Sequence, residues 1–197
     1  MSSSTTGRPL RADAERSVRA ILEAAERVLT ENPTASMEQI AEASGLARTT
    51  VHRRFSSRQA LVDALAASAA RQLAQAIEEA YPEDAPPLVA LHRATANVLR
   101  VKGAWSFALG PAAAQSAQAA ELHEQIDHRC LELLDRARTG GVFAPDADLD
   151  WIRRVLYALI GESLHGAAPA GSDAGSDADP EALAARIVGT LLHGLGA

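Results

Sequence analysis

Apolar residues recur at steps of three and four along most of this 197-residue chain, the spacing that one face of an α-helix produces. Alanine and leucine, both strong helix formers, dominate these positions, whereas strand-type runs of valine, isoleucine and threonine are nearly absent. The sequence therefore predicts an all-α protein of about nine helices, the clearest of which cover residues 13–32, 36–44, 47–55, 57–81, 87–102, 114–137, 148–165 and 180–195.

The predicted helix over 36–44 has a defined start and end. Ser36 and Gln39 have the spacing of a capping box, in which each side chain accepts a hydrogen bond from the other residue's backbone N–H. Ile40 and Ala43 are predicted to face inward. Gly45 follows the last turn, where glycine adopts a left-handed conformation without steric cost. A second short helix then begins near Ala47.

This second helix is predicted to turn a basic face to solvent. Val51 and Phe55, four residues apart, form its inward stripe. The remaining positions point away from that stripe and include no acid. Arginine can pair with the O6 and N7 edge of guanine, and threonine can contact a thymine methyl group. The predicted DNA-binding residues, including phosphate contacts, are Ser36, Arg48, Thr49, Thr50, His52, Arg53, Arg54 and Arg58.

Charge divides the chain at the same place. The net charge is −6 at pH 7, but residues 1–58 carry nine arginines against seven acids, whereas residues 59–197 carry a net −8. Only the first part is therefore suited to phosphate. We expect a flexible arm over residues 1–12, a DNA-binding domain over 13–58, and a separate helical domain over 59–197.

Residues 36–58 read SMEQIAEASGLARTTVHRRFSSR and resemble the TetR family of bacterial transcriptional regulators. The shared features are a capped helix, Ile-Ala, a small residue before glycine, and a phenylalanine three residues after a usually aromatic position. The likeness covers roughly residues 15–65. Three positions depart from it, since His52 replaces a tyrosine, Arg58 a lysine and Ala47 a capping serine. Because histidine changes charge near neutral pH, operator affinity is expected to depend on pH.

The resemblance implies a ligand-responsive repressor that binds a palindromic operator as a homodimer. It also implies a dimer interface built from residues 148–165 and 180–195. The candidate interface side chains are Leu156, Leu159, Ile160, Leu164, Ile187 and Leu191. The alternative for these side chains is the internal core of one subunit, and the sequence does not separate the two.

The resemblance further implies an unknown small-molecule effector between the central helices of residues 59–197, which would make this part of the chain an effector-binding and dimerisation domain. Its candidate contacts are Trp105, Phe107, Leu122, His123, Ile126 and Cys130, and a plain core position is the simpler interpretation for each of them. Glu124 and His128 have helical spacing that suits a cation, but an ordinary surface pair is the simpler interpretation. Cys130 is a single cysteine with no second thiol to resolve an oxidised form.

The chain shows no phosphate loop, dinucleotide fingerprint, nucleophile elbow or zinc-protease motif. We therefore expect neither a cofactor, a metal nor catalysis. The start lacks the pattern of a signal peptide, and no apolar run approaches 18 residues, so a cytoplasmic protein without a membrane span is expected. The competing hypothesis is a helical small-molecule-binding protein or enzyme whose N-terminal region is only structural.

Overall fold

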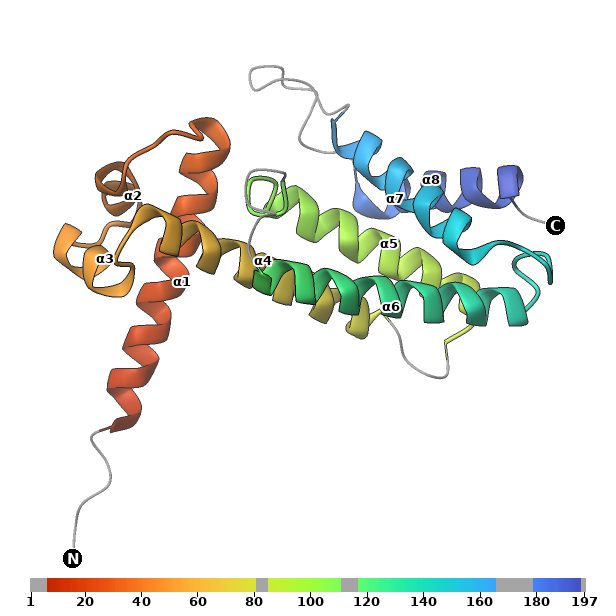
Figure 1. Ribbon diagram of the computed structural model, residues 1–197, viewed down its shortest axis with the longest axis horizontal. Helices are drawn as coiled ribbons and strands as arrows, with labels where there is room; N and C mark the ends of the chain where they lie inside the picture. The colour runs from red at the N-terminus through yellow and green to blue at the C-terminus, as the bar shows by residue number, and fades with distance from the viewer. Residues whose placement is uncertain (1–6, 81–84, 111–116, 166–178, 196–197) are drawn as a thin grey trace, which may run out of the picture. The chain divides into compact units, whose positions relative to one another are not determined.

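The computed structural model describes residues 7–80, 85–110, 117–165 and 179–195, and these ranges contain eight helices and no strand (Figure 1). In chain order the helices are α1 (Gly7–Glu31), α2 (Met37–Ser44), α3 (Arg48–Arg54), α4 (Arg58–Glu79), α5 (Pro87–Ala104), α6 (Ala117–Thr139), α7 (Leu149–His165) and α8 (Pro180–Leu195). The all-α prediction is confirmed. The count is one below the expected nine, and the stretch around Trp105 forms hydrogen-bonded turns.

The chain forms two compact units, which we call the head and the body. The head comprises residues 1–69 and 105–116, and the body comprises residues 70–104 and 117–197. The division falls within α4 and not at residue 58, because Leu61 and Leu65 from the first turns of α4 are fully buried in the head core. The head therefore consists of α1 to α3, the first half of α4 and the segment after α5.

Two features of the head, one helix start and one inward-facing position, differ from the sequence prediction. Helix α1 begins at Gly7 and not near Asp13, so the described part of the predicted arm is helical, while residues 1–6 lie outside the described ranges. Pro9 falls in the first turn, where a missing backbone N–H costs no helical hydrogen bond. Ala43 is exposed, and Ala41 takes the inward place beside Ile40.

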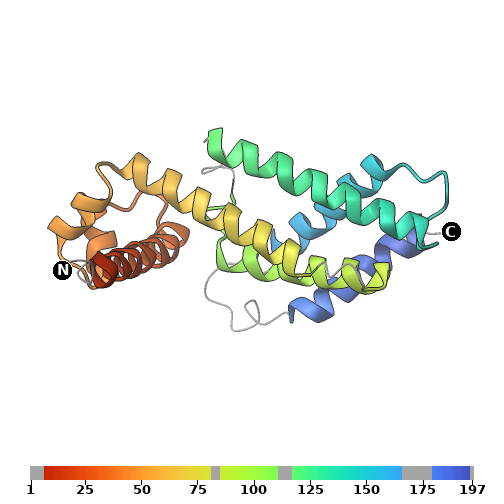
Figure 2. The same cartoon turned by 90° about the horizontal axis from the view of Figure 1, so that it is seen from below.

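The body is a bundle in which α5 packs against α6, α7 and α8, and α7 contacts both α6 and α8. The second half of α4 runs beside α5 and α6 (Figure 2), where Asn97 Nδ2 donates to the Ala76 carbonyl over 2.8 Å. Fully buried side chains hold the bundle together, among them Leu91, Leu134, Phe143, Ile152 and Val188. None of the helices in the described ranges has the length and apolar character needed to cross a bilayer.

Four of the six side chains expected at a dimer interface lie instead in the body core. Leu156, Ile160, Ile187 and Leu191 are at most 4% exposed, and Leu159 and Leu164 pack against the same core. Of the two alternatives that the sequence left open, the structure shows the internal core for these four, since periodicity marks an apolar stripe without identifying its partner. The outward positions of the two helices are others, including Ala158 on α7 and Ala185 on α8.

Candidate functional site

Helices α2 and α3 form a helix-turn-helix whose termini follow the sequence. The Ser36 hydroxyl accepts from the Gln39 backbone N–H over 3.3 Å, and Gln39 Oε1 accepts from the Ser36 N–H over 2.8 Å. Gly45 has a φ of 67°, which places it in the left-handed region that glycine tolerates. Ala47 provides no side-chain cap for α3. The predicted capping box, glycine turn and missing cap are all confirmed.

The exposed side of α3 is basic and contains no acid. Val51 is fully buried and Phe55 is 7% exposed, so these two side chains anchor the helix in the head core. Arg48, Thr49, His52, Arg53 and Arg54 are exposed, and Thr50 is half-buried. The structure thus gathers six of the eight predicted DNA-binding residues on one short helix.

One acid faces this surface from the neighbouring helix. Glu38 of α2 forms an ion pair with Arg48 of α3, with 2.5 Å between Oε1 and Nη2. A backbone hydrogen bond at Glu38, followed by the positive charge of Arg48, holds the pKa of the Glu38 carboxyl below its ordinary value. Sequence spacing did not indicate this pair, because its two members come from different helices.

Arg58 supports the turn that precedes α2. Its Nε donates to the Ala35 carbonyl over 3.2 Å, and its Nη2 donates to the Pro33 carbonyl. These bonds hold the backbone just ahead of Ser36. Arg58 is therefore a positioning residue for the helix-turn-helix, and its predicted phosphate contact stays a prediction.

A buried carboxylate joins α1 to the segment that follows α5. Glu26 is 5% exposed, and it accepts from the backbone N–H groups of Phe107 over 2.7 Å and Ala108 over 3.1 Å. The hydroxyl of Thr30 donates to the same carboxylate. Burial raises the pKa of Glu26, whereas these hydrogen bonds lower it, and burial is the larger effect. All these groups belong to the head.

The body encloses a cavity of about 220 Å³ between α4, α5, α6 and α7. Most of its wall is aliphatic. Its polar lining residues are Thr95, Lys102, His123, Asp127 and Tyr157, with Cys130 beside them. The cavity is apolar with a few polar groups, which is the usual character of a small-molecule site.

The polar groups of this wall differ in whether they have hydrogen-bond or ion-pair partners. Asp127 Oδ1 accepts from the Tyr157 hydroxyl over 2.9 Å, and Oδ2 lies 3.0 Å from Arg153 Nη1. Burial raises the pKa of the Cys130 thiol to about 11, so the thiol is neutral and unreactive at neutral pH. Burial also lowers the pKa of Lys102, which has no ion-pair partner among the described residues.

Three of the six predicted effector contacts lie on this wall, namely His123, Ile126 and Cys130. Trp105 and Phe107 instead pack against the head core. The side chain of Leu122 lies outside what the structure describes. Lys102 and Tyr157 were missed, because their places in a shared wall depend on helix packing that one sequence does not reveal.

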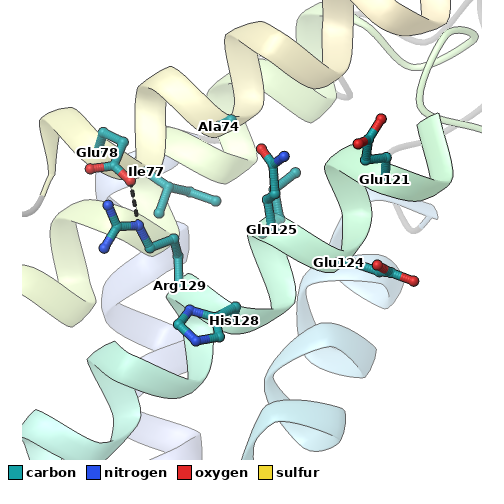
Figure 3. Close-up of a pocket in the computed structure, with 9 residues that line it drawn as sticks. Ala74, Ile77, Glu78, Glu121, Glu124, Gln125, His128 and Arg129 are labelled. Carbon is teal, nitrogen blue, oxygen red and sulfur yellow. Dashed lines mark ion pairs between the residues drawn. The ribbon is translucent and has the colours of Figure 1, made fainter. Parts of the chain in front are cut away.

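A second hollow of about 550 Å³ lies on the outer side of α4 and α6 (Figure 3). Ile77 and Ile126 line both hollows, so the two adjoin. Glu78 of α4 pairs with Arg129 of α6 across it, with 2.6 Å between Oε1 and Nε. His128 pairs with Glu132 and not with Glu124. No group of three potential metal ligands occurs among the described residues.

Comparison with known proteins shows which family and which proteins this chain is similar to. A family model for bacterial regulatory proteins of the tetR family matches residues 21–65. The transcriptional repressor LfrR of Mycolicibacterium smegmatis is 36% identical over 147 residues, which are 74% of this chain and 76% of that protein.

Solved structures agree with this match. The crystal structure of the TetR-like regulator LfrR in complex with proflavine has a TM-score of 0.69 and 30% identity, covering 91% of this chain and 97% of that one. The regulator PfmR from Thermus thermophilus has a TM-score of 0.71 at 22% identity, covering 88% and 97%, and so supports the fold alone.

Proposed function

This chain belongs to the TetR family of bacterial transcriptional regulators, and we propose that it is a repressor that binds a palindromic operator as a homodimer and releases it when an effector fills the body cavity. The observation that carries the proposal is the exposed face of α3, which is basic, free of acids and anchored by two buried side chains. A cytoplasmic location accompanies this role, because operator DNA lies there in a bacterium.

The DNA-reading role falls to Arg48, Thr49 and Arg53. All three are exposed on α3, and arginine and threonine can both contact base edges in the major groove. We assign hydrogen bonds to the surrounding phosphates to Ser36, Thr50, His52 and Arg54. Such phosphate contacts fix the register of the protein on DNA without selecting a sequence.

Two copies of the head are needed to read a palindrome. We assign the dimer contact to the outward sides of α7 and α8, because their inward sides are filled by the body core. Ala158 on α7 and Ala185 on α8 are exposed there, and small side chains let helices approach closely. The two α3 helices must then lie about 34–36 Å or a multiple of this apart to enter successive major grooves.

Effector control requires a physical connection from cavity to head, and α4 supplies one. Leu73 and Ile77 of α4 line the cavity, whereas Leu61 and Leu65 of the same helix lie in the head core. A ligand favours one state of the protein only through a difference in affinity for the two states. A relative binds proflavine in a crystal, which supports a small-molecule effector here.

The test is a titration of the chain against DNA from upstream of its own gene, with and without a broad panel of small molecules. The proposal predicts specific binding that at least one compound weakens. No specific binding would contradict the regulator assignment, whereas binding that no compound alters would contradict effector control only.

A further inference from the structure

We propose that the body cavity selects an apolar molecule that carries a single anionic group, and that Lys102 pairs with this anion. The proposal rests on the function proposed above, because it names the chemical class of the effector.

The cavity first requires an apolar partner of moderate size. Ten of its fifteen lining side chains are aliphatic or alanine, or are the neutral thiol of Cys130, and the four helices that supply them leave about 220 Å³. This volume lies just below the usual range of about 300–1,000 Å³ for ligand pockets, so a chain or ring of modest length fits best.

Lys102 then supplies an unmatched positive charge. It is the single lysine of the chain, it lies half-buried in the last turn of α5, and it lines the cavity. No carboxylate in the described residues pairs with it. Burial lowers its pKa, although the C-terminal end of α5 favours a cation at this position. An anion in the cavity would offset the desolvation of this ammonium group.

The single acid of the lining offers little to a cation. Both oxygens of Asp127 are engaged, one by the Tyr157 hydroxyl and the other by the Arg153 guanidinium. Thr95 donates its hydroxyl to the Leu91 carbonyl over 2.8 Å and is likewise occupied. The wall therefore carries one positive charge without a partner and no unpartnered negative charge among the described residues.

Three compounds with the same hydrocarbon chain test this inference by calorimetric titration of the full-length protein without DNA. Octanoate, octanol and octylammonium differ only in the charge of the head group. The proposal predicts that octanoate binds at least about tenfold more tightly than octylammonium, the gain typical of a charge-assisted hydrogen bond. Octylammonium binding as tightly as octanoate overturns it, as does an absence of octanoate binding.

Substitutions at Lys102 test whether this side chain binds the anionic group of octanoate. Lys102→Met should weaken octanoate binding about tenfold and leave octanol binding within twofold, and Lys102→Arg should keep most of the octanoate affinity. Arg93→Met is the matched control, because Arg93 is exposed on the same helix and does not line the cavity. Unchanged octanoate affinity in Lys102→Met overturns the assignment. Operator binding by the wild-type chain, measured separately, tests the proposed function itself.

Discussion

Glu38 and Arg48 form an ion pair 2.5 Å long between α2 and α3, so the first arginine of the predicted DNA-reading helix has a carboxylate partner within the protein itself. Both side chains are well exposed, at 47% and 66%, and the pair adds little to stability. We expect its effect to fall on DNA binding, because the carboxylate both pairs with Arg48 and repels phosphate.

Replacing this acid should strengthen DNA binding. Glu38→Gln leaves Arg48 unpaired, and we expect operator affinity to rise several-fold. The slope of log affinity against log salt concentration should also become steeper, by the equivalent of about one released counterion. Fluorescence anisotropy at several salt concentrations measures both quantities. Glu42→Gln removes an exposed acid from the same helix and serves as control. Equal behaviour of the two variants would show that the contact with Arg48 has no role in binding.

Arg53 and Arg58 are expected to act differently on DNA. Arg53→Ala should cost about 1–3 kcal/mol on the operator and relax the preference at one base pair, if Arg53 contacts a base edge. Arg58→Ala should weaken all sequences alike, because Arg58 holds the turn before Ser36 through the Pro33 and Ala35 carbonyls. Binding measured on a set of single-base operator variants separates the two patterns. If the two variants lose affinity in the same pattern across these operators, the separate roles assigned to Arg53 and Arg58 are contradicted.

Glu26 should make stability depend on pH. Its pKa is raised in the folded protein, so its contribution to the unfolding free energy is complete below the ordinary value of 4.5 and is lost as pH rises through the folded value. Glu26→Gln cannot titrate, and it places an amide donor against one of two backbone N–H groups. We expect a loss of about 1–3 kcal/mol and a flatter pH profile in urea unfolding.

The exposed Glu23, on the same helix, provides the control for this measurement. Glu23→Gln should match the wild-type protein in both stability and pH dependence. If Glu26→Gln is as stable as Glu23→Gln, the carboxylate does not hold the Phe107–Ala108 segment in solution.

A charged side chain at Ala185 should separate the dimer without unfolding it. Ala185 is exposed on α8, so arginine fits the monomer but places a charge in the proposed contact. Ala185→Arg is expected to be monomeric in light scattering and to bind the operator at least about tenfold more weakly. Leu191→Ala, which truncates a core side chain 1% exposed, should instead lower stability by about 2–5 kcal/mol. A dimeric Ala185→Arg protein would place the interface elsewhere.

Local features of the head could be predicted because their causes lie close together in sequence. The Ser36–Gln39 capping box, the Gly45 turn and the Val51–Phe55 anchor each depend on residues within four positions of one another. The body was less predictable. Leu156 and Ile187 form an apolar stripe whether they face a partner subunit or their own core, and only the packing of α7 and α8 shows that they face the core.

Contacts between distant segments were the part that the sequence could not supply. Glu26 and Phe107 are 81 positions apart, and nothing in either neighbourhood indicates the other. Lys102 belongs to no recognisable sequence motif, and it lines the cavity because α4, α5, α6 and α7 pack together around it. Such contacts depend on tertiary packing, which hydrophobic periodicity does not encode.

The central claim is that the α3 face reads DNA sequence, and one competition experiment tests it most directly. The wild-type chain is titrated against a palindrome from upstream of its own gene and against a scrambled duplex of equal composition, at about 150 mM salt. The account predicts a preference of at least about a thousandfold for the palindrome, and Arg53→Ala should reduce this preference. Equal affinity for the two duplexes would contradict it.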